Sequence, residues 1–307
     1  MEPTAIAEIR RLIAKAKRWD LVFSLLGLLA LLIAVMVLVG LFMNLLWEGA
    51  PRISWEFFTN FSSRRATNAG IAAAWVGTLL VMLVTALTAV PLGVAAGVYL
   101  EEYAPKNWLT GLIEINISNL AGVPSVVYGL LGLGLFVYLL GLGQSIAAAG
   151  LTLALLILPI VIVATREAIR AIPRAIREGA YALGATKWQM VADHIIPYSS
   201  AGILTGVIIG LARAIGETAP LITVGAAVAI FSYPSSPVKS EFPFLSFDWL
   251  HESFTVMPIQ MFQWTSRPDQ AFQVNAAAAG LVLIALTLAM KGFAIWLRYR
   301  LRKNIKW

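Results

Sequence analysis

Two stretches of this 307-residue sequence carry residues that could do chemistry, and both lie between Arg166 and Leu221. The first is a charged segment with glycines and prolines that separates two apolar runs of membrane-spanning length. The second is a pair of opposite charges, Arg213 and Glu217, inside the later of those two runs. A docking surface combined with a charged site inside the bilayer favours a protein that moves a solute across a membrane over a simple membrane anchor.

Arg213 and Glu217 are four residues apart, which would place them on one face of the predicted fifth helix. A charge at the bilayer centre costs about 2.5–3.5 kcal/mol, so it must be paired or line a polar cavity. The pair could fix helix packing, or it could form an anion site, because a guanidinium group matches an oxyanion bidentately. Glu217 could then hold Arg213 between turnovers, or accept the proton of hydrogen phosphate, which sulfate lacks. Thr218, with Thr205 and Thr223, could add hydroxyl donors.

The charged segment predicts two short helices with a sharp corner at Gly184. Pro173 suits the first turn of a helix, and Thr186 with Gln189 forms a capping box for a second helix that would end at Pro197. The first helix has an apolar face at helical spacing, made of Ile172, Ile176, Ala180 and Leu183. This element could simply link two membrane spans, or it could be a knob that a cytoplasmic partner grips.

The composition predicts an all-α membrane protein, because 59% of the residues are apolar and only 13% are charged, against about 25% in soluble domains. Without cysteine, disulfide and thiol chemistry are excluded, and two isolated histidines predict no metal site. Six apolar runs predict six transmembrane helices, at 21–46, 71–100, 120–142, 146–165, 201–231 and 275–297.

Features within these runs predict how the helices pack. Gly93 and Gly97 have the spacing that lets helices approach closely, and Pro91 predicts a kink. Ala121 to Ser125 combines Gly, Pro and Ser, which predicts an unwound or kinked turn at membrane depth.

The distribution of basic residues predicts the orientation. With six spans, 17 of the 23 Lys and Arg residues fall on the side of the two termini and five on the other side. Because positive charge marks the cytoplasmic side, both termini are predicted to be cytoplasmic. This clustering at segment ends also argues against nucleic acid as the reason for the net charge of +7.

The predicted organisation has three parts. Residues 1–69 form a cytoplasmic tail, the first helix and an outer loop; residues 70–298 form a five-helix core with cytoplasmic coupling helices at 173–197; residues 299–307 form a basic cytoplasmic tail. The outer stretches 47–69 and 232–274 could be docking surfaces or gates, or a lid over the helix ends.

Several motifs resemble those of permease subunits in ATP-binding-cassette importers. Glu178-Gly179-Ala180, Gly184 and Ile196-Pro197 resemble their EAA coupling motif, with Gly179 in place of the usual Ala and His194 where an aliphatic residue is common. Residues 212–220, with the sequence ARAIGETAP, resemble the signature of phosphate-importer permeases, and residues 99–104 and 121–129 are similar to further segments of them. Residues 258–260 and 264–268 resemble the A-type branch of that family, PstA.

This resemblance implies a type I importer permease fold, in the cytoplasmic (inner) membrane of a prokaryote, that translocates inorganic phosphate. It implies coupling to an ATPase through six residues, Glu178, Gly179, Ala180, Gly184, Ala185 and Thr186. The implied partners are a homologous C-type permease, two copies of a cytoplasmic ATPase and an extracytoplasmic phosphate-binding protein. The chain has no G-x-x-x-x-G-K-[ST] loop, so we expect ATP and Mg²⁺ on the partner ATPase, no cofactor on this chain and no enzymatic activity of its own.

Three alternatives stay open. A permease for molybdate or sulfate would share the coupling motif, although Arg213, Glu217 and the surrounding signature favour phosphate. A stand-alone secondary transporter or channel would need no cytoplasmic knob. A membrane-embedded enzyme is disfavoured, because the sequence offers no paired carboxylates on one helix face, no metal-ligand cluster and no Ser/His/Asp set.

Overall fold

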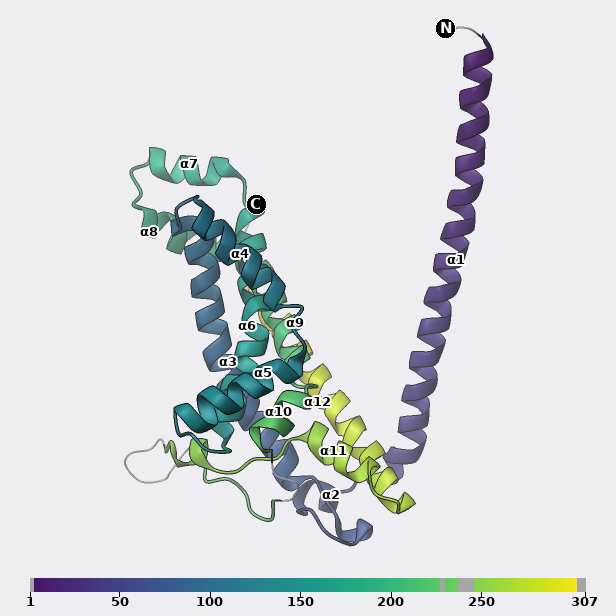
Figure 1. Ribbon diagram of the computed structural model, residues 1–307, viewed down its shortest axis with the longest axis vertical. Helices are drawn as coiled ribbons and strands as arrows, with labels where there is room; N and C mark the ends of the chain where they lie inside the picture. The colour runs from purple at the N-terminus through teal and green to yellow at the C-terminus, as the bar shows by residue number, and fades with distance from the viewer. Residues whose placement is uncertain (1–2, 227–229, 237–245, 303–307) are drawn as a thin grey trace.

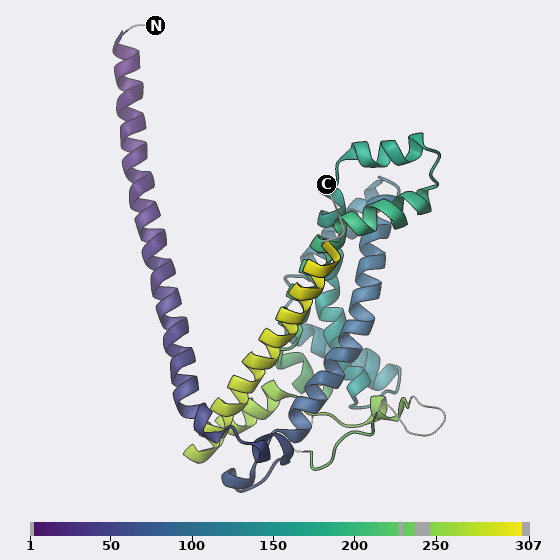
Figure 2. The same ribbon diagram turned by 180° about the vertical axis from the view of Figure 1, so that it is seen from behind.

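The computed structural model describes residues 3–226, 230–236 and 246–302, and these residues form helices and loops without a strand (Figure 1). Five helical stretches in this part of the chain are long and apolar enough to cross a membrane, and the bent pair Trp108–Leu120 and Ser125–Leu139 makes a sixth. The start of α1, the end of α12 and the helices α7 and α8 lie toward the same end of the molecule (Figures 1 and 2). Because both ends on one side require an even number of crossings, the described residues make six crossings with the bent pair counted as one, as predicted.

The first helix, α1 (Pro3–Gly49), stands apart from the other helices over most of its length (Figures 1 and 2). It is longer than the predicted span 21–46, because the N-terminal tail continues the same helix. The side chains of its apolar stretch are exposed in this single chain. It meets the bundle at its outer end, where a β-carbon at Gly49 would lie 2.7 Å from the backbone of Ala277 and Ala278.

Four long helices form the bundle, and α6 lies at its centre, with most of its membrane-spanning stretch buried. These helices are α3 (Ala72–Val98), α6 (Ile146–Arg170), α9 (Ile196–Ala214) and α12 (Gln270–Arg302). A β-carbon at Gly93 would lie 2.7 Å from the Val161 side chain, and one at Gly97 would lie 2.6 Å from Thr165. The prediction that these two glycines allow close packing is therefore confirmed, and their partner is α6.

The third crossing is broken rather than straight. Its halves are α4 (Trp108–Leu120) and α5 (Ser125–Gly132), which continues as the π-helical turn η4 (Leu133–Leu139), and they meet at 106°. The predicted turn at Ala121 to Ser125 is confirmed. The prediction that the membrane run begins at Leu120 is wrong, because α4 already belongs to this crossing. The one acidic side chain of α4, Glu114, is paired with Arg166 of α6 at 2.6 Å. Because this pairing neutralises the charge, a semi-polar helix can form the first half of the crossing.

The fifth run, predicted as one helix over 201–231, is also broken. α9 ends at Ala214, a turn follows, and α10 (Ala219–Val224) begins anew and ends at Gly225, whose φ is +96°. Pro220 explains the break, because its ring would remove the helical hydrogen bond to Gly216, whereas proline is tolerated in the first turn of a new helix. Residues 227–229 of the predicted run lie outside the described residues.

The two outer stretches pack as a lid over the helix ends (Figure 1). They contain η1 (Ala50–Arg52), α2 (Trp55–Thr59), η2 (Ala66–Asn68), η6 (Asp248–His251) and α11 (Met257–Thr265). Phe57, Met257 and Trp264 are fully buried in this lid, and the Met257 amide donates to the Thr78 hydroxyl of α3 at 2.9 Å. The lid interpretation is confirmed for its described part, and a docking role stays a prediction.

The cytoplasmic end carries the predicted pair of short helices, α7 (Arg174–Ala182) and α8 (Lys187–Gln189). The π-helical turn η5 (Met190–Ile195) joins α8 to α9, so that one helical stretch runs from Lys187 to Ala214. The prediction that Pro197 ends the second helix is wrong, because Pro197 lies in the first turn of α9 directly after η5. α12 likewise continues through Arg302, and residues 303–307 of the predicted basic tail lie outside the described residues.

Candidate functional site

The intramembrane pair lies at the break between α9 and α10, in the outer half of the bundle (Figure 1). Arg213 is in the last turn of α9, and Glu217 follows the helix end, held by a hydrogen bond from its amide to the Ala214 carbonyl at 3.2 Å. The Arg213 Nε donates to Glu217 Oε1 at 3.2 Å. The two side chains do form an ion pair, but across a turn and not on one helical face as predicted.

The pair sits at the edge of the largest apolar cluster in the bundle. Its neighbours in sequence, Ala214, Ile215 and Leu221, are buried there together with Tyr128 of α5. By contrast, the Arg213 side chain is 37% exposed and the Glu217 side chain 19%. The charges therefore lie on a surface of the bundle that this single chain leaves partly open.

Only one nitrogen of the Arg213 guanidinium is used by Glu217. Within the part of the chain that the structure describes, the contact runs through Nε, and the two Nη groups donate no hydrogen bond. A guanidinium group with both terminal nitrogens open can present two parallel donors to an oxyanion. The role of Arg213 and Glu217 as an anion site stays a prediction.

Two segments that are far apart in the sequence meet at this break. A β-carbon at Gly129 of α5 would lie 2.6 Å from Pro220 of α10, so only glycine permits this contact. The Tyr128 hydroxyl donates to the Leu120 carbonyl at 2.8 Å across the bend of the third crossing. The bend of the third crossing and the break in the fifth crossing therefore pack against each other close to Arg213.

Of the three threonines considered as extra donors, the structure leaves only Thr218 beside the pair. It precedes α10, and its side chain makes no capping hydrogen bond there. The Thr223 hydroxyl donates to the Pro220 carbonyl at 2.8 Å. The Thr205 hydroxyl donates to Ala201 and accepts from Arg298 of α12, well away from the break.

The corner between α7 and α8 has the geometry that its sequence predicts. Gly184 has φ of +82°, a conformation that L side chains rarely adopt. Its amide donates to the Tyr181 carbonyl at 2.9 Å, and the Ala185 amide donates to the Ala180 carbonyl at 3.0 Å, which closes the end of α7. The capping box is confirmed, since Thr186 and Gln189 bond each other's backbone amides.

The six predicted coupling residues gather at this corner, most of them exposed. Glu178, Gly179, Gly184 and Thr186 are exposed, Ala185 is half-buried, and Ala180 is buried against the bundle. Leu183 is 92% exposed and Trp188 is 68% exposed, so large apolar side chains stand on the tip. Leu183, predicted on the same apolar face as Ile172 and Ala180, is exposed where those two are buried, because α7 ends at Ala182 and Leu183 already lies in the turn. An exposed apolar tip is the kind of surface that a partner covers.

A group of charged residues that was not assigned a role in the sequence lies behind the corner. The π-helical turn η3 (Tyr99–Tyr103) at the end of α3 carries Glu101 and Glu102. Arg177 of α7 donates to Glu102 at 2.7 Å, and Arg170 of α6 donates to Glu101 at 3.0 Å. The acidic pair after an apolar run was visible in the sequence, but its partners are about 70 residues away along the chain.

Similarity to known proteins shows which family this chain belongs to. The family model described as "Binding-protein-dependent transport system inner membrane component" matches residues 89–303. This chain belongs to that family. It is a membrane-spanning permease subunit of a transporter, and the predicted all-α importer fold is confirmed.

Relatives of this permease have specific names. The chain is 33% identical over 280 residues to the "Probable ABC transporter permease protein YqgI" of Bacillus subtilis, with 91% of this chain and 94% of the relative covered. It is 33% identical over 230 residues to the "Phosphate transport system permease protein PstA 1" of Mycobacterium tuberculosis, with 75% and 71% covered. It is 31% identical over 271 residues to the "Phosphate transport system permease protein PstA" of Yersinia pestis, with 86% and 84% covered.

Solved structures agree in fold. A bacterial alginate ABC transporter, solved with an alginate-bound periplasmic protein, has a chain that matches with a TM-score of 0.65 over 94% of this permease and 96% of that chain, at 16% identity. The MetNI methionine ABC transporter, in an inward-facing conformation, matches with a TM-score of 0.57 over 73% and 93%, at 15% identity. At this identity the likeness concerns the fold of the permease.

Proposed function

We propose that this permease is the A-type subunit, PstA, of an ATP-driven importer of inorganic phosphate in the cytoplasmic membrane of a prokaryote. The observation that supports phosphate as the substrate is the partly exposed Arg213–Glu217 pair at the α9–α10 break, in which the two Nη groups of the arginine donate no hydrogen bond to the described residues. The names of the relatives from Mycobacterium tuberculosis and Yersinia pestis support the same substrate.

The pair recognises hydrogen phosphate through complementary chemistry. The Nη groups of Arg213 donate to two phosphate oxygens, and a carboxylate oxygen of Glu217 accepts the proton that hydrogen phosphate carries. Thr218 supplies a further hydroxyl at the same turn. Sulfate has no proton to donate to Glu217, so the carboxylate repels it.

The corner at Gly184 is the part of this chain that the ATPase moves when it binds and hydrolyses ATP. Its exposed residues, Glu178, Gly179, Gly184 and Thr186, dock into a cytoplasmic ATPase, with Ala180 and Ala185 setting the packing behind them. Because one helical stretch runs from Lys187 to Ala214, a displacement of the corner is carried along α9 to Arg213. Hydrolysis of Mg-ATP occurs on the ATPase, and this chain has no catalytic role of its own.

The complete transporter contains this chain, a homologous C-type permease, two copies of the ATPase and an extracytoplasmic phosphate-binding protein. A second permease would cover the open side of the Arg213–Glu217 pair and complete the pathway between the two chains. The binding protein would deliver phosphate from the side of the lid.

Uptake into proteoliposomes tests this function. The permease would be purified with the co-encoded membrane and ATPase subunits, reconstituted, and supplied with binding protein and labelled phosphate. We expect uptake only with Mg-ATP, unaffected by excess sulfate or molybdate. Uptake of another oxyanion in preference to phosphate would refute the substrate. Phosphate uptake driven by an ion gradient without an associated ATPase would refute the class of transporter.

A further inference from the structure

The π-helical turn η3 at the end of α3 is gripped by three successive elements of the cytoplasmic segment. Glu101 contacts Arg166 and Arg170 at the end of α6, Glu102 contacts Arg177 of α7, and Tyr103 contacts Lys187 of α8. Successive residues of a helix point in different directions, so three adjacent side chains reach three different elements. We call Glu101, Glu102 and Tyr103 with these partners the cytoplasmic clasp.

The contact between Glu102 and Arg177 is a largely buried ion pair that joins α7 to the end of α3. The Nε and Nη2 of Arg177 both donate to one Glu102 oxygen, at 2.9 and 2.7 Å, and the two side chains are 19% and 8% exposed. Arg177 also donates to the carbonyls of Ile169 and Ile172, at 3.0 and 2.9 Å, at the end of α6. One side chain thereby joins α7, α6 and the end of α3.

The remaining contacts hold the π-helical turn η3 to α6 and to α8. Arg170 donates to both oxygens of Glu101, at 3.3 and 3.0 Å. Arg166, which is almost fully buried, lies 2.6 Å from Glu114 of α4 and 3.7 Å from Glu101. The Lys187 ammonium lies 4.9 Å from the ring centre of Tyr103. Through Arg166, the clasp is therefore also connected to α4, the first half of the broken third crossing.

An apolar cluster lies behind these charges and belongs to the same elements. Ile169, Ile172, Ala180 and Met190 are buried together, with Val98 of α3 packed against them. On the other side, a cleft of about 850 Å³ separates α7 from η3 and α4, and it is lined by charged residues. α7 is thus held to α3 by ion pairs that lie between this apolar cluster and an open cleft.

We propose that the cytoplasmic clasp transmits the motion of the coupling helices to α3 and α4, with Glu101, Glu102 and Tyr103 as positioning residues. Without it, a displacement of α7 and α8 would pass along the chain to α6 and α9, and would reach α3 only through the apolar packing at Val98. With it, the same displacement also moves α3 and the bent third crossing, which packs on α10 beside Arg213. This inference rests on the proposed coupling of the corner at Gly184 to an ATPase.

The first test compares Glu102→Gln with Arg174→Gln in the reconstituted transporter. Arg174 lies one turn before Arg177 on α7 and is exposed, so it is a matched control. We expect Glu102→Gln to keep the ATPase bound and hydrolysing ATP, while the phosphate transported per ATP falls about tenfold, the factor of an ordinary charge-assisted hydrogen bond. The control should transport as wild type does.

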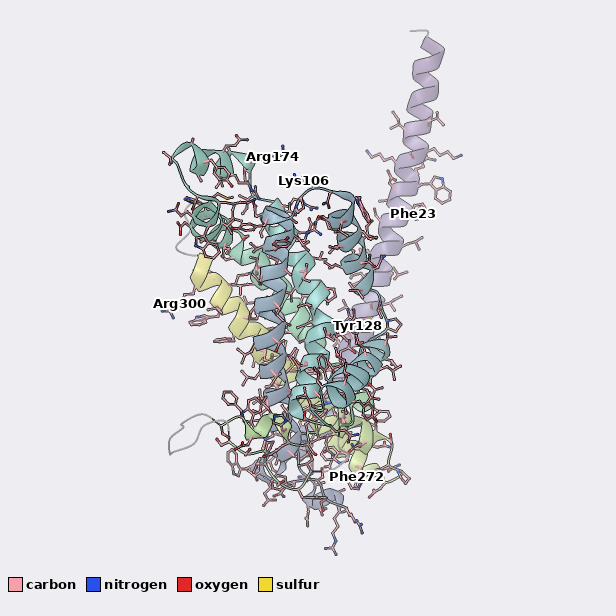
Figure 3. All side chains as sticks on the ribbon, turned by 60° about the vertical axis from the view of Figure 1, so that its left-hand side comes forward. Phe23, Lys106, Tyr128, Arg174, Phe272 and Arg300 are labelled. Atoms are coloured by element: carbon pink, nitrogen blue, oxygen red, sulfur yellow. The ribbon has the colours of Figure 1, made fainter. Side chains whose placement is uncertain are left out.

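The second test measures whether the clasp moves as one body. The chain has no cysteine, so Lys106→Cys and Arg174→Cys place two spin labels without background from this subunit, which is labelled before assembly with its partners. Both residues line the cleft, at the cytoplasmic end of the molecule (Figure 3). We expect the distance between the labels to be the same in the nucleotide-free and ATP-bound complexes, and to change between those states when Glu102→Gln is added.

Each result decides the proposal. A wild-type label distance that changes with ATP, or a Glu102→Gln complex with the normal amount of phosphate per ATP, would overturn it. The label distances need ATP binding but no phosphate. A wild-type transporter that fails to take up phosphate would therefore refute the proposed substrate, while the distances still test the clasp.

Discussion

The Arg213→Gln variant distinguishes two roles for Arg213: a site that binds the transported anion, and an ion pair that only fixes helix packing. The ion pair with Glu217 lies at the edge of the apolar cluster and both side chains are partly exposed, so we expect the complex to assemble without it. Two charge-assisted hydrogen bonds from the Nη groups to the passing anion would contribute about 1.5–3 kcal/mol each. Since about 1.4 kcal/mol corresponds to a factor of ten, phosphate uptake should fall at least about 100-fold.

The matched variants make this prediction specific. Arg213→Lys keeps the charge but loses the planar pair of donors, so we expect an intermediate loss of about tenfold in uptake. The double variant Arg213→Gln with Glu217→Gln removes both charges and leaves no unpaired carboxylate in the membrane. If the pair only fixed helix packing, the double variant would regain uptake.

The assay measures labelled phosphate uptake in proteoliposomes beside the yield and thermal stability of the purified complex. Our reasoning requires that Arg213→Gln and the double variant both lose uptake while their complexes stay intact. A double variant with near-normal uptake would refute the anion site and leave a structural role for Arg213 and Glu217.

Three further predictions concern packing and the coupling corner. Gly184→Val forces a β-branched residue to φ of +82°, so ATPase copurification should be lost, whereas Gly184→Asn, which tolerates this conformation, should retain it. Thr186→Ala removes the capping box and should lower the stability of the second coupling helix by about 1 kcal/mol, measured as faster amide exchange over α8 and η5. Gly206→Leu inserts a side chain where a β-carbon would already lie 2.1 Å from Ala164, so the complex should not assemble in a pull-down, and an intact complex would contradict the α6–α9 packing.

The features that the sequence predicted well have local causes. The capping box at Thr186 and the corner at Gly184 depend on residues within a few positions of each other. The six crossings follow from apolar length, and the close approach at Gly93 and Gly97 follows from residue size.

The features that the sequence did not predict depend on contacts between residues far apart in the chain, or on breaks inside apolar runs. The run through Arg213 is apolar on both sides, so hydropathy alone does not reveal that α9 ends at Ala214, although Pro220 was a local signal of the break. Glu114 makes the stretch 108–119 semi-polar, and the arginine that neutralises it, Arg166, lies 52 positions later in the sequence. The contact of Glu102 with Arg177 depends on the packed fold and leaves no periodic pattern.

The most direct test of the proposed function is ATP hydrolysis by the reconstituted transporter, with the binding protein loaded in turn with phosphate, sulfate or molybdate. We predict that phosphate-loaded binding protein stimulates hydrolysis several-fold, that the other two anions do not, and that Arg213→Gln loses phosphate uptake. Equal stimulation by sulfate or molybdate would contradict the assignment of phosphate as the substrate. A purified complex without ATPase activity would contradict the account of the corner at Gly184 as its docking site.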